Sequence, residues 1–185
     1  MNKTGLRQFF NKMKGGKRCP PRAPVSESIW SAVGGFLGIA AIYVIGHLQG
    51  LQLEHNLFLV GSFGASAVLL YGIPLSPFAQ PRNLLGGHLV SACVGVSFYL
   101  LFPEQLLLAS SFAVGIAIGL MHITRTLHPP GGATALIAVV GGDAVHQLGY
   151  LYILTPIGLG AVIMLLVALL VNNLAAGRHY PEYWW

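Results

Sequence analysis

Six long apolar stretches alternate along this chain with short groups of polar residues, glycine and proline. A helix of about 20 apolar residues spans the hydrocarbon core of a bilayer, and most of the stretches come close to that length. The pattern therefore predicts an all-α polytopic membrane protein of six segments, of which the second and fifth are short or broken. The six segments cover residues 29–46, 57–73, 84–102, 106–123, 131–141 and 151–174.

Composition excludes an ordinary soluble domain. Hydrophobic residues make up 55% of the 185 residues and charged residues only 8%, whereas a soluble domain carries roughly 25% charged residues. The mean hydropathy is +0.69. We expect an integral membrane protein with the lipid bilayer as a partner and no nucleic acid, and leave a homo-oligomer open. The aromatic tail at residues 179–185 is expected to anchor at the membrane interface or to pack on the domain.

Positive charge gathers near the N-terminus, since residues 1–22 hold seven of the ten Lys and Arg. Residues 1–27 are expected to form a basic, Pro- and Gly-rich cytosolic arm that is mostly disordered. If six segments cross from an inside N-terminus, Arg82, Arg125 and Arg178 also fall inside, as the positive-inside rule requires. Both termini are then cytoplasmic, and we expect a bacterial inner membrane. A four-crossing alternative with re-entrant second and fifth segments would place Arg82 and Arg125 outside.

The predicted transmembrane domain, residues 28–178, divides into two similar halves, 28–103 and 104–178. Residues 64–70 (GASAVLL) resemble residues 132–138 (GATALIA) at an offset of 68. Each half holds three segments, so the halves must insert with opposite orientation. Inverted repeats with broken helices are a recurrent transporter design, and we expect two inverted three-segment repeats here. Chance similarity between small-residue helices is the alternative.

The sequence HPPGGATAL, residues 128–136, places two prolines directly before the fifth segment and two glycines at its start. Proline lacks an N–H donor and glycine is flexible, so a helix should break here and a new one begin. Irregular backbone at membrane depth is tolerated only where it is buried in protein or lines a cavity. Because the first N–H groups of a helix attract anions, we expect a small anion to bind between this helix start and the matching one at residues 64–66, near the midplane.

The candidate anion site combines glycine backbone with the hydroxyls of Ser66 and Thr134. Arg125 would raise the anion concentration at the inner mouth, and His128 would fix the break. Simple packing of small residues, and a purely topogenic role for Arg125, are the alternatives. The predicted substrate-binding residues are Gly64, Ala65, Ser66, Arg125, His128, Gly131, Gly132, Ala133 and Thr134.

Histidine supplies candidates for a coupled proton, because its unperturbed pKa is about 6.5. His88 and His128 are these candidates, with hydrogen-bonded structural roles as the alternative. All five carboxylates are expected in termini or loops, and no hydrolase, Walker or dinucleotide motif is present in the sequence. The two cysteines are far apart and form no Cys-x-x-Cys pair. We therefore expect no enzymatic activity, no cofactor and no metal.

Several of these motifs resemble the HPP family of integral membrane proteins, named after a His-Pro-Pro motif that is here residues 128–130. GSFGASA at 61–67, QPRN at 80–83 and GGH at 86–88 occur with it in the family's order. The resemblance covers about residues 26–178. It implies nitrite transport, with which plant plastid and cyanobacterial members are associated, in a domain usually described with four membrane helices.

The sequence and the resemblance together predict transport of a small inorganic anion, with nitrite as the first candidate substrate. A channel or transporter for another small solute is one alternative. A membrane-embedded sensor or enzyme module is another, although it would need catalytic residues that the sequence does not reveal.

Overall fold

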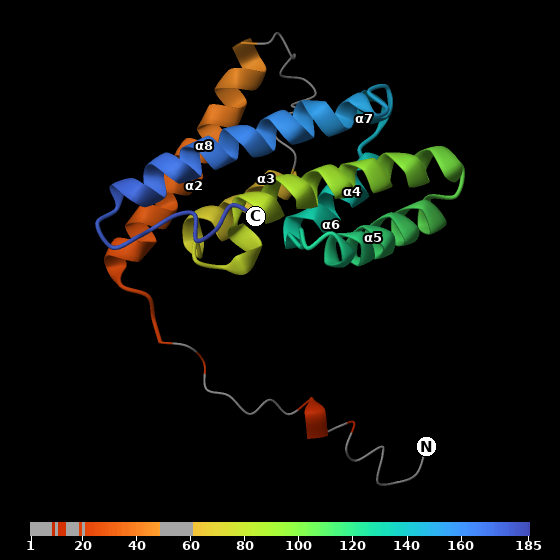
Figure 1. Cartoon of the computed structure of the whole chain (residues 1–185). Helices are drawn as coiled ribbons and strands as arrows, with labels where there is room; N and C mark the ends of the chain where they lie inside the picture. The colour runs from red at the N-terminus through yellow and green to blue at the C-terminus, as the bar shows by residue number, and fades with distance from the viewer. Residues whose placement is uncertain (1–8, 10, 14–18, 20, 49–60) are drawn as a thin grey trace.

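The described part of the chain is entirely helix and loop, which confirms the predicted all-α class. The structure is a computed structural model and describes residues 9, 11–13, 19, 21–48 and 61–185 (Figure 1). The expected basic arm therefore lies largely outside the described residues. Glu27, expected in that arm, lies in the first turn of α2.

Four helical stretches are long and apolar enough to cross a membrane. The last of them contains a π-helical stretch. Pro156 has no N–H to donate there, and Thr155 before it has non-helical dihedral angles. The four stretches are α2 (Val25–Leu48), α4 (Pro81–Leu101), α5 (Leu106–Ile123) and the continuous pair η3 (Ile153–Gly158) and α8 (Leu159–Leu174).

The second and fifth predicted segments are helical but short. The second consists of α3 (Gly61–Ala67) and the π-helical turn η1 (Val68–Gly72), and part of it lies outside the described residues. The fifth is α6 (Pro129–Val140), whose 12 residues span about 18 Å against a hydrocarbon core of about 30 Å. The described helices thus include four of membrane length, and α6 is short as expected. The six-segment inverted repeat stays a prediction.

Several helix ends meet on one face of the domain, which we call the basic face because it carries Arg82, Arg125 and Arg178. The Arg82 side chain donates to the Thr124 carbonyl at 2.8 Å, joining the start of α4 to the end of α5. Arg178 forms an ion pair with Glu27 at 2.9 Å, joining the end of α8 to the start of α2. The backbone N–H of Glu182 donates to the Gln80 side chain and links the two regions. That this face lies on the cytosolic side stays a prediction.

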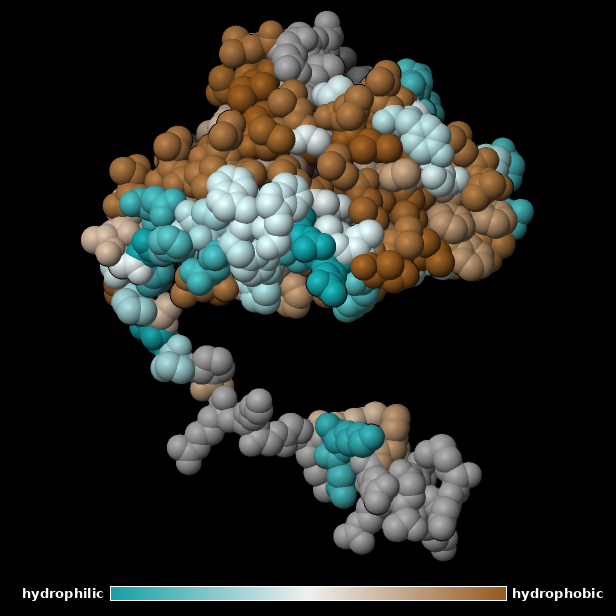
Figure 2. All heavy atoms as spheres, viewed as in Figure 1, coloured by the Kyte–Doolittle hydropathy of each residue, from teal (hydrophilic) through white to brown (hydrophobic). Residues whose placement is uncertain are grey.

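Two short helices complete the fold at opposite ends. The turn η2 (Pro77–Ala79) precedes α4 on the basic face, and α7 (Asp143–His146) follows α6. Figure 2 shows hydrophobic side chains over most of the face in view, with polar side chains gathered along the edge from which the N-terminal segment leaves.

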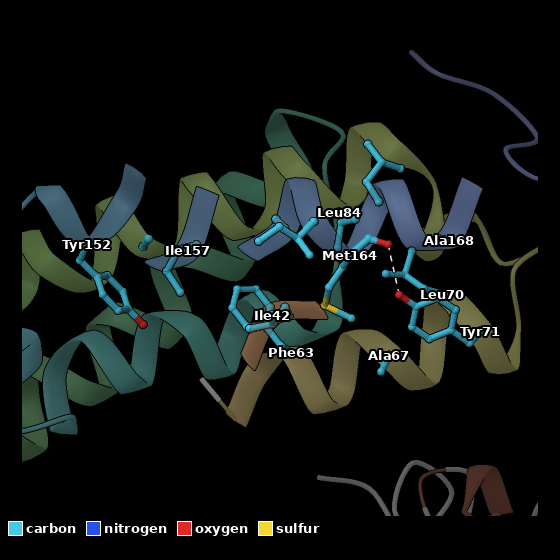
Figure 3. Packing of buried hydrophobic residues seen from close by; sticks show 14 of the residues in the cluster. Ile42, Phe63, Ala67, Leu70, Tyr71, Leu84, Tyr152, Ile157, Met164 and Ala168 are labelled. Atoms are coloured by element: carbon cyan, nitrogen blue, oxygen red, sulfur yellow. Dashed lines mark hydrogen bonds between the residues drawn. The ribbon is translucent and has the colours of Figure 1, made fainter. Parts of the chain in front are cut away.

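Glycines allow two close helix contacts. A methyl group added at Gly95 of α4 would lie 2.5 Å from the Ala135 carbonyl oxygen of α6, so these two backbones approach without side chains between them. Gly34 and Gly38 of α2 face the ring of Tyr71, whose hydroxyl donates to the Met164 carbonyl at 3.2 Å (Figure 3). The corresponding glycines of α5, Gly115 and Gly119, have no neighbour within 4 Å of an added methyl group.

Replacement of Gly95 by alanine should therefore destabilise the domain. The new methyl group would meet rigid backbone, and such overpacking costs about 1–3 kcal/mol. Gly115→Ala is the matched control, because it adds a methyl group to open space on the neighbouring helix. Thermal unfolding in one detergent should show a lower midpoint for Gly95→Ala only, and equal midpoints would contradict this description of the α4–α6 contact.

Candidate functional site

A buried chain of alternating hydroxyl and imidazole groups lies where α3, α4 and α6 meet. The Ser66 hydroxyl is 2.8 Å from Nε2 of His88 and 2.8 Å from Nε2 of His128. On its other ring nitrogen, His88 Nδ1 is 2.8 Å from the Thr134 hydroxyl. All four side chains are fully buried. We call Thr134, His88, Ser66 and His128 the hydroxyl–imidazole chain.

Local sequence explains how these side chains come together. Pro129 and Pro130 occupy the first positions of α6, which suits their fixed φ, and the residue before a proline favours extended backbone. His128 is accordingly extended, with φ −136° and ψ 104°. Gly87 lies against it, because a methyl group there would contact the Cβ of His128 and lie 2.8 Å from the Thr126 carbonyl oxygen. The glycine before His88 thus allows the two imidazoles to lie with ring centroids 4.9 Å apart.

The acceptors fix the direction of every hydrogen bond in the neutral chain. His128 Nδ1 is 2.8 Å from the Phe78 carbonyl oxygen, which can only accept, so Nδ1 carries the proton. Nε2 of His128 is then an acceptor, and Ser66 donates its one proton to it. Ser66 must therefore accept from Nε2–H of His88, and Nδ1 of His88 accepts from Thr134. All donors point from Thr134 toward Phe78.

The turn that ends this chain is held by the segment that follows α8. Three successive carbonyl oxygens of η2 accept side-chain hydrogen bonds: Pro77 from Tyr183 at 3.1 Å, Phe78 from His128, and Ala79 from Tyr180 at 2.8 Å. Burial raises the pKa of the Tyr180 hydroxyl, and nearby Tyr71 raises it further, so Tyr180 remains a donor. The predicted aromatic tail therefore packs on the domain over the site.

Ser62 lies one helical turn before Ser66, and its fully buried hydroxyl has no hydrogen-bond partner among the described residues. Buried polar atoms are nearly always paired in proteins, so an unpaired one needs an explanation. At the other end, Tyr152 donates to the Thr134 carbonyl at 3.3 Å. The polar groups thus extend beyond the four members of the chain.

The structure brings together four of the predicted residues, namely Ser66, His88, His128 and Thr134. Gly131 is buried against the same helix contact, since an added methyl group would lie 3.0 Å from the Gly87 carbonyl oxygen. The others lie outside the chain of hydrogen bonds. Gly64, Ala65 and Arg125 are exposed, and Gly132 and Ala133 are half-buried.

The prediction of a helix start at residues 64–66 is wrong. Ser66 lies in the last turn of α3, and the helix begins at Gly61 among the described residues. A helix does begin at the predicted motif of residues 128–136, where proline is favoured. Pro129 and Pro130 have no N–H group, and Gly131 donates to the His128 carbonyl at 2.8 Å. The start of α6 therefore offers few free donors to an anion.

Sequence reasoning missed the parts of the site that come from outside the helices. The Phe78 carbonyl, Tyr180 and Tyr183 lie close together only in the folded chain. One signal was present in the sequence, namely a glutamine, Gln80, directly before Pro81. In the structure the Gln80 side chain donates to the Pro74 and Ser76 carbonyls and so shapes the turn. In the described part of the chain, no three His, Cys, Asp or Glu side chains are grouped for a metal ion.

These features define an integral, polytopic helical membrane protein with a buried polar chain. The family described as HPP, transmembrane region, matches residues 20–181. The chain therefore belongs to the HPP family.

Two transmembrane proteins of Dictyostelium discoideum are similar over nearly the whole chain. One is 46% identical over 181 residues and the other 45% identical over 183 residues, 96% of this chain in each case. The matched regions cover 58% and 64% of those proteins, so the chain spans less than two thirds of their length. No solved structure matches.

The hydrogen-bond directions predict one tautomer for each buried histidine. In the neutral protein His88 should carry its proton on Nε2 and His128 on Nδ1. Nitrogen chemical shifts of ¹⁵N-histidine-labelled protein distinguish the two forms, and His88→Gln and His128→Gln variants assign the signals. Finding both protons on Nε2 would contradict the bond from His128 to Phe78.

Proposed function

We propose that this chain transports a small inorganic anion across the membrane, with nitrite as the first candidate. The observation that carries the proposal is the fully buried hydroxyl of Ser62, which has no partner among the described residues and lies one turn from Ser66 in the hydroxyl–imidazole chain. A small solute with oxygen acceptors would accept a hydrogen bond from Ser62 and compete for the proton of Ser66. Nitrite has two such oxygens and a single charge.

The chemistry of the surroundings favours an anion over a metal cation. Hydroxyl and imidazole N–H groups donate hydrogen bonds without a fixed charge, which permits reversible binding. No carboxylate is among the hydrogen-bond partners of the chain in the described residues, so nothing there repels an anion. The resemblance to HPP proteins associated with nitrite transport supports the choice of substrate.

Purified protein in liposomes should take up nitrite faster than protein-free liposomes, with saturation. Ser66→Ala should lower the initial rate by about tenfold or more, because two hydrogen bonds of about 1 kcal/mol each are lost. Ser97→Ala is the matched control, since Ser97 bonds to Tyr150 and the Cys93 carbonyl away from the chain. Competition by nitrate, formate and chloride would define selectivity. Wild-type uptake equal to that of protein-free liposomes would reject nitrite.

Ser62→Ala separates a binding role from a structural one. The substitution removes a hydroxyl that has no partner, so the thermal midpoint should stay the same or rise. If Ser62 contacts the solute, the concentration for half-maximal uptake should rise by about five- to tenfold, equivalent to one hydrogen bond of about 1 kcal/mol. Unchanged uptake kinetics in a stable Ser62→Ala protein would remove Ser62 from the path.

A further inference from the structure

We infer that the hydroxyl–imidazole chain is a relay that carries one proton and couples transport to it. The proton is then the coupling ion, and this part of the inference rests on the proposed transport function. Hydrogen bonds of 2.8 Å join Thr134 to His88, His88 to Ser66 and Ser66 to His128. Short bonds between groups that both donate and accept are the requirement for passing protons along a chain.

The relay step balances atom by atom. Thr134 receives a proton from a hydronium ion or from the conjugate acid of the transported anion, and passes its own proton to Nδ1 of His88. His88 passes its Nε2 proton to Ser66, and Ser66 passes its own proton to Nε2 of His128. Each of the first three groups gains one proton and loses one, so the single added proton remains on His128 as an imidazolium.

Every hydrogen bond is still made after the step, and the three bonds between members of the chain are reversed in direction. His128 donates from Nε2 to Ser66 and still donates from Nδ1 to the Phe78 carbonyl. Ser66 donates to His88, and His88 donates from Nδ1 to Thr134. Thr134 then turns its proton to the Pro130 carbonyl oxygen, which lies 3.4 Å away. The buried groups therefore remain paired in both states, and the penalty for an unsatisfied buried donor is avoided.

Among the described residues, the contacts around the chain provide no competing charge. From α3 the Ser66 hydroxyl and the Phe63 ring contact His88. On α5, Met121 is a buried thioether and His122 is exposed. The helices η3 and α8 contain no titratable residue. The remaining titratable contact is Tyr152, which donates to the Thr134 carbonyl.

Because these described contacts include no counter-charge, the relay can supply a positive charge to balance an entering anion. A lone charge buried in an apolar domain is costly, and this holds for an imidazolium as well as for an entering anion. A proton on His128 and an anion beside Ser62 and Ser66 neutralise each other. Proton and anion should therefore be loaded together, one of each per cycle.

Histidine tautomers test the relay without any substrate. In ¹⁵N-histidine-labelled wild-type protein, acidification should form one imidazolium, at His128, and should move the His88 proton from Nε2 to Nδ1 in the same step. In Thr134→Val, His88 has no acceptor for an Nδ1 proton, so this tautomer change should be lost, and Thr134→Ser should restore it. Thr124→Val is the matched control, because the Thr124 hydroxyl bonds to Thr126 outside the chain. If His88 kept its Nε2 proton while His128 charged, or both rings charged, the relay would be wrong.

Flux measurements separate the relay from the choice of substrate. In liposomes containing a pH-sensitive dye, one proton should enter with each nitrite, and Thr134→Val should slow this coupled entry by about 100-fold, as loss of a positioned proton-transfer group does. Thr134→Ser and Thr124→Val should stay near the wild-type rate. Nitrite uptake without protons overturns the relay. The expected tautomer change without nitrite uptake supports the relay and rejects nitrite.

Discussion

The close approach of α4 and α6 is the constraint on which the site depends. Gly87, Gly95 and Gly131 remove the side chains that would separate the two helices. Without this approach the Thr134 hydroxyl could not reach His88, and His128 could not lie beside it. The glycines next to the functional residues thus act through packing. In a membrane, where no hydrophobic force draws helices together, small residues are the usual means of such contact.

A polar chain buried among apolar helices is stable only when every member is paired. Each imidazole here uses both ring nitrogens, and Ser66 both donates and accepts. The Phe78 carbonyl completes the chain, and its position depends on the turn that Tyr180 and Tyr183 hold from either side. The segment after α8 is therefore part of the site in energetic terms, although it contacts none of the four side chains.

Apolar length predicted most of the helices from sequence, and local chemistry explains the differences. The predicted segment 106–123 is α5 itself, because leucine-rich apolar sequence begins and ends there abruptly. In contrast, α4 and α6 begin two or three residues earlier than predicted, at Pro81 and Pro129. Both prolines were expected to precede these helices, whereas proline is favoured in the first turn of a helix.

The candidate site was predicted only in part, and the two similar motifs at residues 64–70 and 132–138 show why. Ser66 and Thr134 occupy matching positions in the two similar motifs, and the structure places both hydroxyls on one imidazole. The sequence could indicate that these motifs correspond, and it singled out His88 and His128. It could not indicate that His88 fills the space between the hydroxyls, because this depends on the long-range contact of α4 with both short helices.

The division of the chain between two packing units limits how the site can open. His88 belongs to α4, Thr134 belongs to α6 and His128 directly precedes α6, and the glycine contact holds these elements together. Ser66 comes from α3, whose continuation η1 packs against α2 through Tyr71. A bond from Asn172 to the Leu70 carbonyl ties η1 to α8, and a bond from Arg178 to the Tyr71 carbonyl ties it to the segment after α8. Under the proposed transport function, a path for the solute would separate Ser66 from the two imidazoles. The π-helical turn η1 begins two residues after Ser66, and irregular helical hydrogen bonding of this kind is frequent at functional sites.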